Sequence, residues 1–272
     1  MTYNEFCAGL SEYSALFHKG LKKQANKFLF SFADEFKENV PQDERDELLC
    51  RFCREFYDED KFPEFRILGS PHLPFQLTGL LHEYLNRECK SEKMPQMRWA
   101  YQLFGRYYNP HDPTLENDPF EILARAYAHP ECDQKTVELY FEQQLGELGF
   151  GAHHFPEGCC IEREVYERDV ATAERILSEH ELPTALAEEL EYYKTLYRVY
   201  YEWSDGGRKG DFYALCEAAG IEFTTPMAFF YKKRRAVFYG ALFFQRRDEL
   251  IDAEYSPYKQ ALTNQKCRQR EY

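Results

Sequence analysis

Apolar residues recur at intervals of three and four along most of this chain, the spacing that places side chains on one face of an α-helix. In residues 41–60 the apolar positions share one such face, and acidic residues crowd the first turn, where the helix dipole favours them. The pattern therefore predicts a helix in this segment. The same pattern predicts helices over residues 73–90, 94–108, 118–128, 133–148, 163–180, 182–203 and 210–220.

Clusters of Pro, Gly and Asn separate the predicted helices, and such clusters are typical of turns. Asp118 and Asp133 precede two of the helices and are expected N-caps, because a carboxylate accepts hydrogen bonds from the free amides of a first turn. Short links between amphipathic helices predict antiparallel hairpins. Strand patterns are confined to two short stretches, 65–70 and 221–226.

The predicted fold class is therefore all-α. We expect roughly nine to eleven helices, packed as antiparallel hairpins into an irregular multi-helix bundle or array. No repeat of fixed period is visible in the sequence, so a regular solenoid is not supported. Residues 1–272 are expected to form a single helical domain, and the loop 109–119 is the best candidate for a sub-boundary within it.

Aromatic residues are abundant, with 23 Phe, 21 Tyr and 2 Trp, and they predict an aromatic core. The N-terminal residues lack the pattern of a signal peptide. The longest apolar run, residues 236–244, is far shorter than the roughly 20 residues of a membrane-spanning helix. The nine cysteines follow no disulfide-framework spacing, which favours free thiols in a reducing compartment. These features together predict a cytoplasmic protein.

The net charge of −13 is unevenly distributed along the chain. Residues 226–272 hold 10 Lys and Arg against 5 Asp and Glu, whereas residues 138–222 hold 19 acidic residues against 7 basic ones. An acidic body repels nucleic acid and anionic membranes and attracts basic partners. We therefore predict a basic protein partner, no nucleic acid and no membrane, and the sequence leaves the oligomeric state open.

One loop, GAHHFPEGCC at 151–160, holds the densest group of metal-ligand residue types. Zinc sites need ligands spaced so that their side chains converge, whereas adjacent residues tend to point apart. The pattern is more typical of a helix C-terminus closed by Gly149 and Gly151 and followed by a proline turn. We predict no metal and no cofactor, and the weak metal candidates are His153, His154, Cys159 and Cys160.

Other catalytic patterns are incomplete. Cys50 and Cys53 have redox-motif spacing but follow about two turns of acidic helix, which raises a thiol pKa, so a structural pair is the better interpretation. His111 and Asp112 form the dipeptide of helical phosphohydrolases but lie in a proline-rich loop. Nucleotide-binding glycine motifs and the zinc-protease motif are absent from the sequence. We therefore expect no catalytic residues and a protein that is not an enzyme.

The segment 185–205 is acidic and rich in tyrosine. On a helical wheel one face, predicted to be core, carries Leu186, Leu190, Tyr193, Tyr197 and Tyr200. A second face mixes carboxylates with an aromatic and an aliphatic residue, which suits a protein interface; a solvated acidic helix is the simpler alternative. The predicted partner-binding residues on this second face are Glu188, Glu191, Tyr192 and Glu202, with Val199 beside them.

The leading functional hypothesis is a non-enzymatic, acidic helical protein that binds a basic protein. One specific form is an immunity-type protein that neutralises a basic toxin, since complementary charge speeds association. The first alternative is a helical metal-dependent hydrolase that uses His and Cys residues of 111–160. The second alternative is a structural or scaffolding helical protein with no specific acidic surface.

Overall fold

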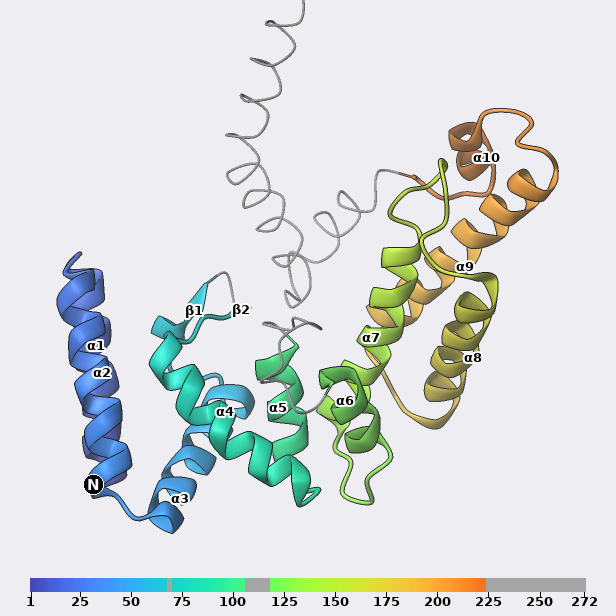
Figure 1. Cartoon of the computed structure of the whole chain (residues 1–272). Coiled ribbons are helices and arrows are strands. Elements are labelled where there is room, and N and C mark those ends of the chain that lie inside the picture. Colours follow the sequence, from blue (N-terminus) through green and yellow to red (C-terminus); the bar gives the residue numbers. More distant parts are fainter. Residues whose placement is uncertain (68–69, 106–117, 224–272) are drawn as a thin grey trace, which may run out of the picture. The chain divides into compact units, whose positions relative to one another are not determined.

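The computed structural model describes residues 1–67, 70–105 and 118–223, and ten α-helices make up most of these residues (Figure 1). The predicted all-α multi-helix fold is confirmed. None of the helices in the described ranges combines the length and hydropathy that a membrane span requires.

The chain divides into two compact units that share helix α7. Of the described residues, unit 1 contains 1–67, 70–105, 118–144 and 173–183, and unit 2 contains 145–172 and 184–223. Two of the three crossings between the units fall inside helices, at 144/145 in α7 and at 172/173 in α8, so no turn signal in the sequence marks them; the third follows Pro183, just before α9. The sub-boundary expected at 109–119 lies almost entirely outside the described residues, and the expected single domain stays a prediction.

Unit 1 is built from helices joined by short turns. The first helix begins with a capping box, in which Thr2 accepts from the backbone of Glu5 and the Glu5 carboxylate accepts from the backbone of Thr2. Helix α1 packs on α2, α4 packs on α2, α3 and α5, and α5 packs on α6. The bounds are α1 Tyr3–His18, α2 Lys22–Asn39, α3 Gln42–Cys53, α4 Phe75–Lys90, α5 Gln96–Phe104 and α6 Pro119–Tyr127, followed by α7 Gln134–Gly151.

The core of unit 1 is aromatic, as the composition predicts. Phe6 is fully buried, and its ring lies 5.3 Å from that of Phe36 and 6.0 Å from that of Phe52 (ring centroids). Trp99 is also fully buried. Each such side chain removes a large apolar area from water, worth about 2–3 kcal/mol. These rings come from α1, α2, α3 and α5, and they hold the four helices together.

Short elements other than α-helices follow α3, including a 3-10 turn at Pro63–Phe65. A π-helical turn, Arg54–Asp58, continues the helix and ends at an aspartate. Farther on, β1 (Arg66–Ile67) pairs antiparallel with β2 (Ser70–Pro71). The strand candidate at 65–70 is therefore confirmed in part, as a two-residue pairing. Of the second candidate, residues 221–223 are not in a strand, and 224–226 lie outside the described residues.

Unit 2 surrounds a second aromatic cluster. The ring of Phe155 stacks on that of Tyr200 at 3.9 Å, and the ring of Tyr166 stacks on that of Tyr197 at 4.4 Å (ring centroids). The Tyr197 hydroxyl donates to the carbonyl oxygen of Leu148 at 2.8 Å and so joins α9 to α7. The remaining helices are α8 Arg163–Glu179, whose last turns belong to unit 1, α9 Thr184–Asp205 and α10 Phe212–Ala218.

Candidate functional site

Helix α9 has the core face that the periodicity predicts. Leu190 is fully buried, and Tyr193 and Tyr197 are almost fully buried against the rest of unit 2. Leu186 and Tyr200 are buried as well. The prediction for this face is confirmed at all five positions.

The second face of α9 agrees with the prediction only in its carboxylates. Glu188, Glu191 and Glu202 are exposed, as expected. Tyr192, which was expected to be exposed, is half-buried, and its hydroxyl oxygen is buried. The expected exposure of Tyr192 is therefore wrong, and partner binding by Tyr192 and by the three exposed carboxylates stays a prediction.

Helix α10 is the reason for this difference, because it packs on α9. Val199, on the same face as Tyr192, is buried. Burial, together with the nearby Cys216 thiol of α10, raises the pKa of Tyr192 to about 12. A helical wheel of α9 alone contains no information about a neighbouring helix, so it could not show that this edge is covered.

A groove of about 490 Å³ runs between α9 and α10. It is open to solvent and mixes apolar and charged side chains. Leu215 on α10 is exposed at its edge, and Glu202 of the acidic face forms part of its wall. The lining residues that matter here are Val199, Glu202, Trp203, Leu215 and Ala218, with Arg198 and Lys209 at the polar side.

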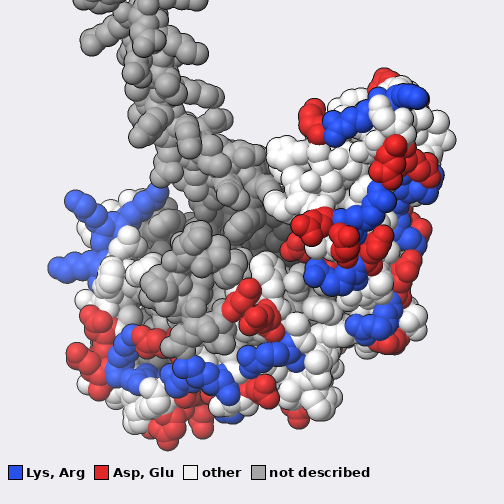
Figure 2. Space-filling view, turned by 45° about the vertical axis from the view of Figure 1, so that its right-hand side comes forward, with Lys and Arg blue, Asp and Glu red and all other residues white. Residues whose placement is uncertain are grey.

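Negative charge is in excess throughout unit 2. Its described residues, 145–172 and 184–223, contain 14 Asp and Glu against 6 Lys and Arg. On α9, Glu191 pairs with Lys194 at 2.7 Å and Glu202 pairs with Arg198 at 3.5 Å, and such exposed pairs are weak. On the face shown in Figure 2, acidic and basic side chains are interspersed rather than gathered in one acidic patch.

The His and Cys loop folds as a turn over the aromatic cluster of unit 2. His153 and His154 are exposed, and their rings stack on each other at 4.9 Å (centroids). Phe155 between them and the cysteines is buried against Tyr200. Cys159 lies near the hydroxyl of Tyr197. Among the described residues, no group of three or more His, Cys, Asp or Glu side chains is placed to hold a metal ion.

Gly151 ends helix α7, as predicted, and it also has a packing role that the sequence did not show. Helix α7 continues through Gly149 to Gly151, so the expected closure at Gly149 is wrong. A Cβ atom on Gly151 would lie 2.0 Å from the Tyr197 hydroxyl oxygen and 2.5 Å from Ile161. Glycine is needed here because α9 approaches the α7 backbone too closely for a side chain.

The Cys50–Cys53 pair has the properties of a structural pair. Cys53 is fully buried, and burial raises the pKa of its thiol well above the ordinary value. A raised thiol pKa disfavours the thiolate that redox chemistry needs. Both thiols are free, and Cys50 accepts a weak hydrogen bond from Gln96 at 3.8 Å. The other candidate pair, His111 and Asp112, lies outside the described residues.

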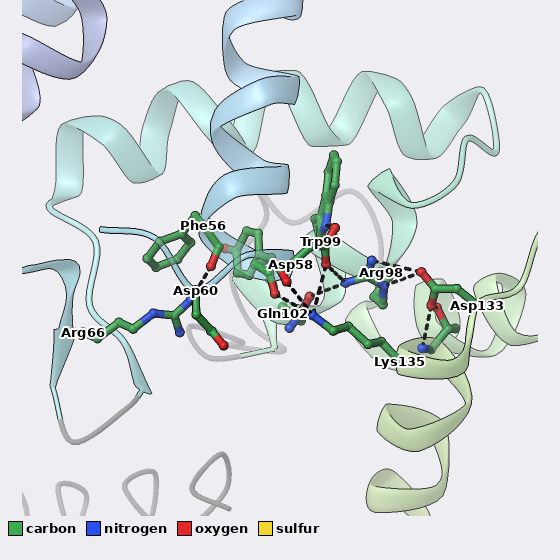
Figure 3. Close-up of polar contacts among 11 residues, drawn as sticks. Phe56, Asp58, Asp60, Arg66, Arg98, Trp99, Gln102, Asp133 and Lys135 are labelled. Carbon is green, nitrogen blue, oxygen red and sulfur yellow. Dashed lines mark hydrogen bonds and ion pairs between the residues drawn. The ribbon is translucent and has the colours of Figure 1, made fainter. Parts of the chain in front are cut away.

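A charged network that the sequence analysis did not identify lies inside unit 1 (Figure 3). Arg98 of α5 is only 2 % exposed, and it donates to Asp58 at 2.8 Å and to Asp133 at 3.1 Å. The indole nitrogen of Trp99 donates to the other Asp58 oxygen at 3.1 Å. Lys135 of α7 donates to the backbone oxygens of Tyr57 and Asp58 at 3.3 and 3.2 Å.

The network joins the π-helical turn to α5 and to the start of α7. Asp133 is the predicted N-cap of α7, and it accepts from the Thr136 amide at 2.8 Å and the Thr136 hydroxyl at 2.6 Å. Burial alone would raise the pKa of Asp133, but the Thr136 hydrogen bonds and the charge of Arg98 outweigh it and leave this pKa below its ordinary value. The network contains two cations, Arg98 and Lys135, and two carboxylates, Asp58 and Asp133. Its charges therefore neutralise one another, and its contacts hold the π-helical turn, α5 and the start of α7 together.

Unit 2 contains two carboxyl groups whose pKa values are raised, in contrast to the lowered pKa of Asp133. Asp169 of α8 is buried and pairs with the exposed Arg168 at 2.9 Å, yet burial raises its pKa. Glu147 of α7 is partly buried, and both burial and the nearby Asp169 charge raise its pKa. Raised carboxyl pKa values of this kind predict that stability falls as the pH rises through them.

Comparison of this chain with protein families, with curated proteins and with solved structures finds no match. The residues themselves therefore carry the functional argument. In unit 2, exposed carboxylates on α9 lie beside an open groove. In unit 1, the charged residues form an ionic network whose charges neutralise one another.

Proposed function

We propose that this chain is a non-enzymatic protein that binds a basic protein partner through the acidic surface of α9. The observation that carries the proposal is the exposure of Glu188, Glu191 and Glu202 along one helix of a unit with a marked excess of acidic residues. A distributed negative charge attracts a basic partner over about a Debye length and speeds the encounter.

The α9–α10 groove would supply the short-range part of this interaction. Interfaces are held mainly by a few apolar or aromatic anchors that fill pockets, while surrounding charges set the rate of association. The groove has apolar walls at Val199, Trp203 and Leu215, and its charged lining residues are Glu202, Arg198 and Lys209. The apolar walls support a partner segment that presents one aliphatic or aromatic side chain, while the exposed carboxylates of α9 attract the basic residues of the partner.

An immunity-type protein that neutralises a basic toxin is the specific form of this proposal. Such a protein has to bind quickly, because protection depends on occupying the toxin before it acts, and electrostatic steering meets that need. Acidity and helical surface support this form. We propose that the protein acts in the cytoplasm, a location that the free cysteines in the described residues support.

A charge-reversal experiment tests the proposal. The immobilised chain is used to capture proteins from a lysate of cells that express it, and the captured protein is purified for rate measurements. With Glu188→Lys, Glu191→Lys and Glu202→Lys combined, we expect association to slow about tenfold or more and its salt dependence to flatten, with the melting temperature unchanged.

The matched control places the same change of charge on unit 1. Asp34, Glu35 and Glu38 are exposed on α2, and their combined replacement by Lys alters the net charge equally. If this control slows association as much as the α9 variant, total charge and not the α9 surface governs binding. If the α9 variant associates at the wild-type rate, the proposed surface is wrong.

A further inference from the structure

The end of the α1–α2 hairpin lies in a long stretch of unit 1 without acidic residues. Between Glu12 and Asp34 the chain contains no Asp or Glu and no Arg, but four lysines and a histidine. All four lysines are exposed, and Figure 2 shows basic side chains projecting together at its left edge, where this end of the hairpin lies. The lysines are Lys19, Lys22, Lys23 and Lys27.

None of these four lysines forms an ion pair with another described residue. Within the described part of the chain, their positive charge is therefore not compensated. Other lysines of unit 1 do form such pairs: Lys37 lies 2.6 Å from Glu83, Lys61 lies 2.8 Å from Glu59, and Lys93 lies 2.8 Å from Glu88. The hairpin end is therefore a local site of positive charge on a protein whose net charge is negative.

Large apolar side chains are exposed at the same place. Phe17 is 37 % exposed, Leu21 40 % and Phe30 52 %. Phe17 follows the buried Tyr13 at helical spacing on α1, and Lys22, the first residue of α2, lies 5.5 Å above its ring. Phe30 follows Lys23 and Lys27 at helical spacing, so it shares their outward face of α2.

We propose that this hairpin end binds the surface of an anionic lipid bilayer. Lysine ammonium groups on flexible stems pair with lipid phosphates and carboxylates, while exposed Phe and Leu side chains enter the boundary between headgroups and acyl chains. Protein interfaces are depleted in Lys and enriched in Arg, and Arg is also the residue that binds nucleic-acid phosphates and bases in a bidentate manner. A stretch with four Lys and no Arg fits a lipid surface better than either.

The net charge of the protein does not prevent this contact. Net charge predicts repulsion from anionic membranes, but exposed charges farther away than about 10 Å are largely screened at 0.1 M salt. A bilayer that touches the hairpin end therefore interacts mainly with the nearby lysines, each of which contributes about fivefold in affinity. The inference is independent of the proposed protein partner, because the hairpin lies in unit 1 and the acidic surface in unit 2.

Co-sedimentation of the full-length chain with lipid vesicles tests the inference. Vesicles of phosphatidylcholine alone are compared with vesicles that contain about one third phosphatidylserine. We expect binding only to the anionic vesicles and a steep loss with added salt. The combined variant Lys22→Gln, Lys23→Gln and Lys27→Gln should bind about a hundredfold more weakly.

Two matched controls separate the hairpin end from general effects. Lys61→Gln, Lys90→Gln and Lys93→Gln remove the same charge from elsewhere in unit 1 and should leave binding within about twofold. Phe30→Ser should weaken binding, whereas the same change at Phe75, which is more exposed, should not. Circular dichroism melts verify that all variants are folded.

Several outcomes would overturn the inference. These are failure to sediment with anionic vesicles, equal weakening by the two lysine triples, or equal binding to phosphatidylcholine alone. Binding of a poly-glutamate peptide or a DNA oligonucleotide through the same lysines, without vesicle binding, would assign the hairpin end to another class of partner.

Discussion

The guanidinium of Arg98 lies 2.8 Å from the carboxylate of Asp58 although the Arg98 side chain is almost completely withdrawn from solvent. The same guanidinium also pairs with Asp133, so one buried cation holds two segments of unit 1 against α5. Removing a single member of such a network leaves the other charges without their partner.

Replacement of Arg98 by Met should therefore destabilise the protein by about 3 kcal/mol, because Asp58 and Asp133 keep their charges and lose their main cation. Urea unfolding measures the effect. The same change at Arg175, whose pair with Glu179 is exposed, should cost less than about 1 kcal/mol. An equal loss of unfolding free energy at both positions would show that the buried pair contributes no more to stability than the exposed pair.

Asp133 should make the protein less stable in acid. Its pKa in the folded state lies below the unfolded value, so its ionised form contributes stability above the unfolded pKa, and this contribution is lost as the pH falls through the folded pKa. Asp133→Asn should lower the melting temperature at pH 7 and change it little near pH 2. A variant with an equal loss at both pH values would show that the charge of Asp133 is not the relevant property.

Asp169 should have the opposite effect on how stability depends on pH. Burial raises its folded-state pKa, so the ionised form is disfavoured, and stability falls as the pH rises from the unfolded pKa through the folded pKa. Asp169→Asn should raise the melting temperature at pH 7 and have little effect near pH 3. The exposed Glu164, changed to Gln, provides the comparison. A lower melting temperature at pH 7 would show that the pairing with Arg168 outweighs the cost of burial.

Gly151→Ala should destabilise unit 2 by about 1–3 kcal/mol, because the new methyl group would overlap the Tyr197 hydroxyl and Ile161. Gly146 lies in the same helix, and a Cβ there meets no atom within 4 Å. Gly146→Ala should therefore be neutral or stabilise the protein by up to about 1 kcal/mol, through helix propensity. Thermal unfolding of the two variants measures the difference, and a stable Gly151→Ala variant would show that α9 can shift away.

Leu190→Ala should cost about 2–5 kcal/mol, because Leu190 is fully buried in the core face of α9 and its loss leaves a cavity. Glu191 follows it in the helix and is exposed, so Glu191→Ala should change stability by less than about 0.5 kcal/mol. Equal effects in chemical denaturation would contradict the assignment of the two faces.

The sequence by itself determined eight of the ten described α-helices, α3 to α10, and the core face of α9, whereas α1 and α2 were not among the predicted helices. Helical periodicity is a local property, and an apolar stripe on a helix has to be buried in some way whatever its partner is. Helix starts at Asp118 and Asp133 were equally predictable, since a capping carboxylate acts on amides two or three residues away. The charge distribution could also be counted, including the acid-free stretch between Glu12 and Asp34.

Only the tertiary structure decided which surfaces remain available and which charges are buried. Tyr192 is half-buried because α10 packs on its edge of α9, and Gly151 is required because Tyr197 approaches from another helix. Arg98 is buried because its partners, 40 and 35 residues away in sequence, reach it through the fold. Such contacts depend on how helices pack, and the periodicity of one segment contains no information about the side chains that a distant segment brings to it.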